Sequence, residues 1–371
     1  MRDIAEGIAA WQAAGTRYAV ATVVGTWKSA PRQPGAAMAV AENGDVIGSV
    51  SGGCVEGAVY EAATEVIATG APVLTTYGVS DDDAFQAGLT CGGIIDIYVR
   101  PAGPGHFPLL PGVLDAVAAG RPVAVASLLS GPPGPGGPPL GERDLVVTPD
   151  TVAGTLGDAR LDAGLVERAR GMLARGATGT VRVGAGGEQR GDDVAVFVQS
   201  FAPPPRMLVF GAIDFAGAVA RMGKFLGYHV TVCDARPVFA TRKRFPDADE
   251  LVVSWPHRFL DRTAVDENTV ICVLTHDPKF DVPLLERALR TPARYVGAMG
   301  SRRTHEDRLR RLRELGVPES SLARLASPIG LDLGARTPEE TAVAIMAEVI
   351  ALAWGGTGRR LLNTPPGPIH R

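Results

Sequence analysis

The sequence is poor in cysteine and lacks any long apolar run. It has four cysteines among 371 residues, none spaced as Cys-x-x-Cys, which excludes a disulfide scaffold, a zinc ribbon and a thioredoxin motif. No apolar stretch approaches the roughly 18 residues that span a bilayer, and the first residues carry acids where a secretory signal would not. We therefore expect reduced thiols in a cytoplasmic protein without a membrane span.

An excess of charge of either sign is also missing. Lys and Arg total 37 against 40 Asp and Glu, which gives a formal net charge of −3 and no basic footprint for nucleic acid. The sequence contains no HExxH, P-loop, readable catalytic triad or carboxylate pair. The expected ligand is therefore a small molecule or another protein, and not a nucleic acid.

Proline and glycine divide the chain. Consecutive prolines in the segment 202–206 exclude regular structure and predict a linker. The low-complexity segment 130–143 is expected to be a mobile loop. Region 1–201 has an α+β pattern, with a strand at 18–26 and a helix at 54–68 among its elements. The pattern leaves open whether this region forms one subdomain or two.

The C-terminal region, 207–371, alternates strands and helices regularly. Its expected strands are 207–210, 229–233, 270–274 and 294–298. Short connections between such strands predict parallel βαβ units. A final helix is expected to begin after Thr337, where Pro338 and Glu340 complete a capping box. The fold class is therefore α/β, with an α+β N-terminal domain followed by a Rossmann-type parallel-sheet domain.

The first loop of the predicted Rossmann-type domain departs from a dinucleotide fingerprint. Gly211 holds the first glycine position, but Ile213 occupies the second, where glycine lets the backbone approach a pyrophosphate. Asp214 adds negative charge at a helix N-terminus that would otherwise attract anions. In favour of a nucleotide, Asp234 ends the next strand, where an acid binds ribose, and Arg236 can meet a phosphate. The loop fits either a nucleotide site or a scaffold kept for folding or docking.

Three further loops are expected at the carboxyl edge of the same sheet, where open α/β folds bind ligands. Their candidate cofactor-binding residues are His276, Asp277, Gly300, Ser301, Arg302 and Asp332. The middle loop combines glycine, a hydroxyl and arginine at a helix start, which is typical of an anion site. Ordinary turn chemistry explains each loop better when it is taken alone. Several polar loops at one edge favour a binding crevice.

Two cysteines lie beside glycine pairs. Cys54 follows Gly52 and Gly53 where a strand meets a helix, a position that exposes sulfur and favours the thiolate. Cys91 precedes a second glycine pair. Two such thiols ligate a soft metal, carry sulfur or pair under oxidation, or they only fill tight turns as small residues. Glu56 is either a base for the thiol or an exposed acid of the first helical turn.

The chain resembles the XdhC/CoxI family, accessory proteins that mature molybdenum hydroxylases such as xanthine dehydrogenase and carbon monoxide dehydrogenase. The likeness rests on the segments 31–38, 48–56, 90–93, 275–279, 297–302 and 328–340. The resemblance implies a chaperone that binds the molybdenum cofactor, as molybdopterin or its dinucleotide form. The chaperone protects the cofactor while sulfur is added and hands it to the apo hydroxylase. On this reading Gln33 belongs to the cofactor site, and Cys54 and Cys91 lie at the metal.

The resemblance also defines partners and alternatives. The implied partners are an apo molybdenum hydroxylase, a cysteine desulfurase and a second copy of the chain in a homodimer. Family members look like Gly followed by His where this chain has Ile213 and Asp214, which weakens the case for a dinucleotide. The alternative is an NAD(P)-dependent oxidoreductase, or a xanthine dehydrogenase-associated subunit that uses the Rossmann domain; a purely structural partner is the third. Because the chain lacks cysteine arrays for iron–sulfur clusters and is too short for a molybdenum catalytic subunit, we expect an accessory protein.

Overall fold

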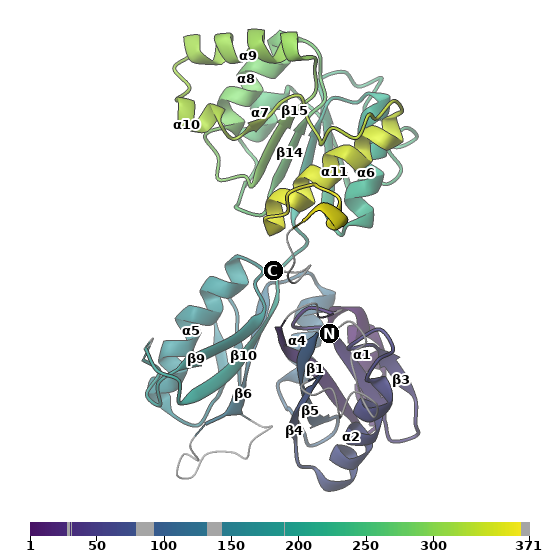
Figure 1. Cartoon of the computed structure of the whole chain (residues 1–371), viewed down its shortest axis with the longest axis vertical. Helices are drawn as coiled ribbons and strands as arrows, with labels where there is room; N and C mark the ends of the chain where they lie inside the picture. Colours follow the sequence, from purple (N-terminus) through teal and green to yellow (C-terminus); the bar gives the residue numbers. More distant parts are fainter. Residues whose placement is uncertain (28–29, 31, 79–92, 132–142, 189, 365–371) are drawn as a thin grey trace. The chain divides into compact units, whose positions relative to one another are not determined.

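The computed structural model describes residues 1–364 except 28–29, 31, 79–92, 132–142 and 189. The described residues form two compact units, 1–203 and 204–364 (Figure 1). Most of the predicted loop 130–143 lies outside the described residues, and so does Cys91. Within the described ranges, no helix is both long enough and apolar enough to cross a bilayer.

The N-terminal unit begins with one antiparallel sheet and its helices. The sheet has the order β3-β2-β1-β5-β4. Its strands are β1 (Tyr18–Trp27), β2 (Ala37–Ala41), β3 (Val46–Gly48), β4 (Val73–Tyr77) and β5 (Ile94–Ala102). Helix α1 (Ala5–Ala13) precedes β1, and α2 (Glu56–Thr69) connects β3 to β4. The α+β texture expected for this region is confirmed.

A second sheet in the same unit repeats this topology. Its order is β8-β7-β6-β10-β9. Its strands are β6 (Val123–Ser130), β7 (Asp144–Val147), β8 (Val152–Thr155), β9 (Gly179–Val183) and β10 (Val194–Phe201). Helix α4 (Leu110–Ala118) precedes β6, and α5 (Ala159–Ala174) connects β8 to β9. Both halves therefore run α-β-β-β-α-β-β with the same strand order, so the unit is an internal duplication.

The two halves share a core. Val20 of β1 and Val125 of β6 belong to one buried cluster that also takes side chains from α1 and α4. Buried Arg100 of β5 and Asp144 of β7 form an ion pair at 2.7 Å between the sheets, and Thr180 Oγ donates to a β1 carbonyl at 2.7 Å. The N-terminal unit is therefore held together by apolar packing and by polar contacts between its halves.

The C-terminal unit has a six-stranded parallel sheet with the order β13-β12-β11-β14-β15-β16. Its strands are β11 (Arg206–Phe210), β12 (His229–Asp234), β13 (Glu250–Val253), β14 (Val270–Val273), β15 (Tyr295–Ala298) and β16 (Leu325–Ala326). Numbered from β11, this is the order 3-2-1-4-5-6 of doubly wound nucleotide-binding folds. The predicted Rossmann-type domain is confirmed.

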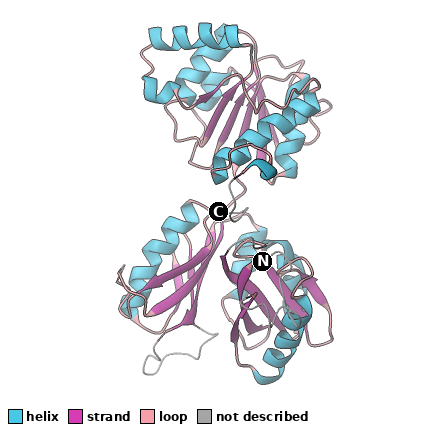
Figure 2. Ribbon diagram, viewed as in Figure 1, coloured by secondary structure: helices cyan, strands magenta, loops and turns pink. Residues whose placement is uncertain are grey.

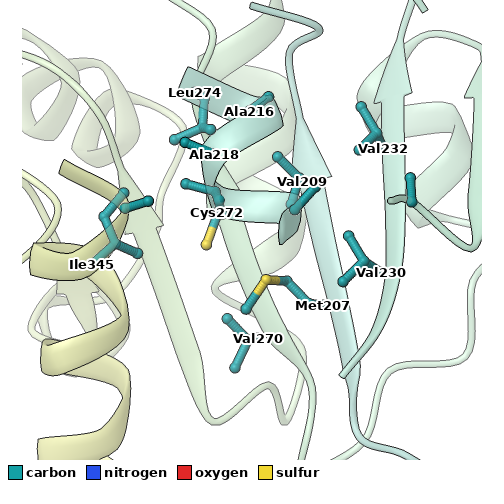
Figure 3. Packing of buried hydrophobic residues seen from close by; sticks show 14 of the residues in the cluster. Met207, Val209, Ala216, Ala218, Val230, Val232, Val270, Cys272, Leu274 and Ile345 are labelled. Carbon is teal, nitrogen blue, oxygen red and sulfur yellow. The ribbon is translucent and has the colours of Figure 1, made fainter. Parts of the chain in front are cut away.

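Helices cover both faces of this sheet (Figure 2). They are α6 (Asp214–Phe225), α7 (Pro256–Leu260), α8 (Pro278–Ala288), α9 (Arg302–Glu314), α10 (Glu319–Leu322) and α11 (Pro338–Trp354). Successive strand residues point to opposite faces, so Val209 and Cys272 pack with α6 and α11 (Figure 3). Leu208 and Ile271 pack on the other face with α8 and α9. Because both faces are buried, the central strands are apolar throughout.

Two features of this fold position a site. The strand order reverses between β11 and its neighbours β12 and β14, and ligands of such sheets bind outside the carboxyl ends at that point. The predicted capping box of α11 is confirmed: Thr337 Oγ accepts from the Glu340 N–H at 3.1 Å, and Glu340 accepts from the Thr337 N–H at 3.2 Å.

Candidate functional site

The loop between β3 and α2 is closed by the carboxylate of Glu56. This carboxylate accepts hydrogen bonds from Ser49 Oγ at 2.7 Å, from the N–H groups of Ser51, Gly52 and Gly53 at 2.9, 3.0 and 2.8 Å, and from Ser51 Oγ. Burial raises the pKa of Glu56, but the hydrogen bonds from Ser51 and Ser49 outweigh it and lower that pKa to about 2. A carboxyl with this pKa is a poor base at neutral pH. Glu56 therefore fixes the loop, and it fits neither the base nor the exposed acid that the sequence suggested.

Glycine at the tip of this loop is required by the backbone conformation. Gly52 and Gly53 have φ values of 81° and 118°, while a Cβ at either position would meet nothing within 4 Å. Successive N–H groups in such a turn converge on one anion, which here is the protein's own Glu56. The predicted helix 54–68 begins later, at Glu56, so Cys54 lies in the loop, where it is exposed. The loop is thus fixed through its backbone and presents a thiol.

The segment after β1 packs beside this loop. Arg32 donates to the Ser49 carbonyl at 3.4 Å and to Asp3 at 3.3 Å. Gln33 is exposed on the next turn, so the printed contacts to the loop come from its neighbour. Cys91, the second expected thiol, lies outside the described residues. Among the described side chains, no group of three or more His, Cys, Asp or Glu is placed to hold a metal ion.

The second half of the unit repeats the carboxylate closure. Asp162 in α5 accepts from Thr155 Oγ and from the next backbone N–H, both at 2.7 Å. In the first half, Glu56 accepts from Ser49 Oγ at 2.7 Å and from the next backbone N–H at 3.3 Å. Both carboxylates therefore tie the end of a third strand to the start of the following helix.

The thiol and the glycine pair are not repeated. Each loop begins at a glycine with positive φ, Gly48 at 80° and Gly154 at 88°, where a Cβ would lie 2.3 and 2.1 Å from a carbonyl oxygen of the neighbouring strand. Counted from these glycines, Arg160 stands at the position of Cys54. Asp158 replaces the first loop glycine and caps α5 by accepting from two backbone N–H groups. The closure thus belongs to the fold, whereas the Gly-Gly-Cys tip belongs to the first half alone.

The carboxylate of Asp234 is occupied in the C-terminal unit. It is 3% exposed and accepts from the Ala212 N–H at 2.7 Å and from the Arg236 guanidinium in a bidentate pair, with both bonds at 2.9 Å. Burial raises the pKa of Asp234, but the Arg236 hydrogen bonds and the Ala212 N–H lower it below the ordinary value. A ribose diol would have to displace Arg236 before it met this acid.

The defective phosphate loop is neutralised in the same way. Gly211 has a φ of 107°, and a Cβ there would lie 2.9 Å from Thr275, which explains the retained glycine. Asp214 forms an ion pair with Arg244 at 3.0 Å, and Ile213 precedes α6 without a side-chain capping bond. A cavity of about 200 Å³ beside this loop is lined by Ala212, Ile213, Asp214, Arg236, Phe239 and Arg244.

A larger pocket, of about 400 Å³, lies farther along the carboxyl edge. It is lined by Phe215, His276, Met299, Gly300, Ser301, Thr304, Pro328, Ile329 and Thr341. Three of the predicted residues, His276, Gly300 and Ser301, therefore meet at one pocket. Asp277 instead caps α8, and Arg302 and Asp332 are exposed outside the pocket lining. The aromatic and apolar walls with hydroxyls at the rim suit a flat heterocycle.

Comparison with known proteins places the chain in a family. It matches the XdhC and CoxI family over residues 11–78 and 116–184, one stretch in each half of the N-terminal unit, and the XdhC Rossmann domain over 207–349. It is 27% identical over 333 residues to a probable xanthine dehydrogenase subunit of Bacillus subtilis, which covers 89% of this chain and 92% of that protein.

Two further relatives agree with this placement. The molybdenum cofactor insertion chaperone PaoD of Escherichia coli is 26% identical over 331 residues, which cover 89% of this chain and 82% of that protein. A crystal structure described as a xanthine dehydrogenase from Bacillus halodurans superposes with a TM-score of 0.70 and 25% identity over 98% of both chains. The duplicated N-terminal unit, the Rossmann-type unit and these matches together show that the chain belongs to the XdhC and CoxI family.

Proposed function

We propose that this protein binds the molybdenum cofactor and inserts it into a molybdenum hydroxylase. Membership of the XdhC and CoxI family supports this role, as does the similarity to a molybdenum cofactor insertion chaperone. The observation that carries the proposal is the position of Cys54. The cysteine is exposed on a loop that Glu56 fixes, and the duplicate loop keeps the closure but has Arg160 in its place.

The chemistry of this loop suits a cargo that contains molybdenum and sulfur. Thiolate is a soft ligand, and a loop already fixed in its bound conformation loses little entropy when it binds. An exposed thiol also leaves the bound group accessible to the next protein. We assign Cys54 to the molybdenum end of the cofactor, and the proposal extends to Cys91 as a second thiol.

We assign the Rossmann pocket to a heterocyclic ring of the same cofactor, either the pterin or the base of its dinucleotide form. Phe215, Met299 and Ile329 provide apolar walls, and Ser301 and Thr304 provide hydroxyls. Such a combination binds a planar ring and orients it through the polar groups. This assignment is independent of the thiol loop and is tested separately.

An NAD(P)-dependent oxidoreductase has less support. Its ribose acceptor, Asp234, is already bound by Arg236, and Ile213 stands where a glycine would admit the pyrophosphate. Titration with NAD(H) and NADP(H) up to millimolar concentration separates the two proposals. Saturable binding that Asp234→Ala weakens would favour the oxidoreductase.

The direct test is cofactor retention by the purified chain. Molybdenum cofactor released from a donor hydroxylase is added, the protein is separated by gel filtration, and molybdenum and pterin are measured in the protein fraction. We expect retention by the wild type and about a tenfold loss in Cys54→Ser. Glu61→Gln, an exposed change on the same helix, is the matched control and should retain the cofactor. Absence of retention by the wild type would overturn the proposal.

The proposed partners are an apo molybdenum hydroxylase, a cysteine desulfurase that supplies sulfur, and a second copy of the chain. Transfer from the loaded chain should restore activity to the apo hydroxylase, more slowly from Cys54→Ser than from the wild type. Mass determination in solution tests the homodimer, and co-purification tests the desulfurase.

A further inference from the structure

The pocket of about 400 Å³ in the C-terminal unit is built from loops that follow three neighbouring strands. His276 comes from the loop after β14, Gly300 from the loop after β15, and Pro328 from the loop after β16. Loops of this kind have no ladder hydrogen bonds to hold them together. The pocket therefore keeps its shape only if something else fixes the three loops relative to one another.

The residue before each of these pocket residues is tied to one buried ion pair. Arg308 of α9 and Asp281 of α8 are 3% and 2% exposed and lie 2.9 Å apart. The Arg308 guanidinium also donates to the Met299 carbonyl and to Ser327 Oγ, both at 3.0 Å. Asp281 accepts from Thr275 Oγ. One pair of opposite charges thus contacts all three loops at the residue next to the pocket.

We infer that Arg308 is the positioning residue of this pocket, which it shapes through the three loops without lining it. The inference rests on the proposed function for the identity of the ligand, but not for the geometry. No part of the Arg308 side chain is among the pocket lining. Its effect on a ligand therefore passes through Met299, Ser327 and Asp281.

The choice of an ion pair supports a positioning role over a stabilising one. Desolvation of two charges largely offsets their attraction, so apolar residues of similar size often stabilise a fold equally well. A planar guanidinium offers donors in fixed directions, and here they reach a carboxylate, a carbonyl and a hydroxyl on separate elements. A lysine would keep the charge but present a compact donor on a flexible stem.

Hydrogen exchange of loop amides tests the inference without a ligand. The Met299 N–H donates to a β14 carbonyl at 2.8 Å, and the Ile329 N–H donates to a β15 carbonyl at 3.2 Å. In Arg308→Lys we expect both amides to exchange about tenfold faster, while the amides of β11 are unchanged. Arg311→Lys is the matched control, because Arg311 lies on the same helix and pairs at the surface with Asp307.

A second variant removes the charges without leaving either one buried alone. Asp281→Leu combined with Arg308→Met fills the site with apolar side chains, and such replacements are often tolerated. We expect this double variant to melt within a few degrees of the wild type and still to show faster exchange at Met299 and Ile329. Unchanged exchange at both amides in a folded variant would refute the positioning role.

Cofactor retention supplies the functional readout. With the assay of the proposed function, Arg308→Lys and the double variant should each retain about tenfold less molybdenum cofactor, and Arg311→Lys should match the wild type. Full retention in the double variant would also refute the inference. If the wild type retains no cofactor, the proposed function fails, and the exchange rates still decide whether Arg308 positions the loops.

Discussion

Replacement of Glu56 by glutamine is the sharpest perturbation of the thiol loop. The side chain keeps its size and one acceptor oxygen, but an NH₂ group takes the place of the other oxygen. Whichever way the amide points, a donor then faces N–H groups of the loop, such as those of Gly52 and Gly53. We expect the loop to open more often, because the carboxylate holds it closed through these donors.

The magnitude follows from the hydrogen bonds that are lost. A hydrogen bond to a charged group contributes about 1.5–3 kcal/mol net, and an unpaired buried donor costs about 1–3 kcal/mol. The pKa of Glu56 gives a similar figure: its fall from 4.5 to about 2 corresponds to about 3 kcal/mol, which solvent screening of a partly exposed group reduces. We therefore expect about 2 kcal/mol, which is roughly a 30-fold shift in the opening equilibrium.

Native-state hydrogen exchange measures this equilibrium directly. In Glu56→Gln, the amides of residues 51–53 should exchange roughly 30-fold faster than in the wild type. The amides of β1 should change little, since they report on the folding of the whole unit. Glu61→Gln, which removes one negative charge from the exposed side of the same helix, should leave all of these rates unchanged.

The reasoning fails if exchange at residues 51–53 is the same in Glu56→Gln and in the wild type. That result would mean that Glu56 does not fix the loop, and that its short contacts contribute nothing to loop order. A uniform rise across the unit, β1 included, would contradict the assignment of the effect to local opening.

Other predictions follow from the same loop. Gly53→Ala should cost about 1–2 kcal/mol, seen as a lower melting temperature of the N-terminal unit, because a φ of 118° strains any residue with a Cβ even where space is free. Since the pKa of Glu56 is about 2 in the folded loop and 4.5 for the ordinary side chain, its contribution should be complete above about pH 4.5 and should disappear as the pH falls toward 2. Exchange at residues 51–53, corrected for intrinsic rates, tests that window. Combining Asp158→Gly, Ala159→Gly and Arg160→Cys should add an exposed thiol to the second half and raise the molybdenum retained per chain; unchanged retention would show that more than the loop tip is required.

The Rossmann-type unit could be predicted because its local signals agree with its tertiary packing. Apolar strands such as 207–210 alternate with amphipathic helices, and short connections permit only parallel crossovers. The capping box at Thr337 is a local interaction, so the sequence alone locates it. The partner of Asp234 could not be predicted in the same way: the sequence places an acid at the end of β12, but not the guanidinium of Arg236 upon it.

The internal duplication was missed, although the sequence carries a signal for it. Residues 19–24 read Ala-Val-Ala-Thr-Val-Val and residues 124–129 read Ala-Val-Ala-Ser-Leu-Leu. Loops of different composition follow the two segments, and the cysteine is present in only one half. Comparison of the halves identifies Asp162 as the counterpart of Glu56, which separates what the fold needs from what the thiol site needs.

Arg308 could not be found from the sequence for a different reason. It is one of several arginines on α9, and only the packing of α8 against α9 decides which of them is buried. A charged residue beside Leu309 and Leu312 gives a weak hint that it lies on the inner face. Its partners, Asp281 and Ser327, are far away in sequence, so their convergence is visible only in three dimensions.

The central claim is that the sulfur of Cys54 meets molybdenum. X-ray absorption at the molybdenum edge of the cofactor-loaded chain tests it directly, with Cys54→Ser loaded under the same conditions. The account predicts that the wild type shows one more sulfur neighbour of molybdenum than the variant. Identical spectra from two equally loaded proteins would contradict it.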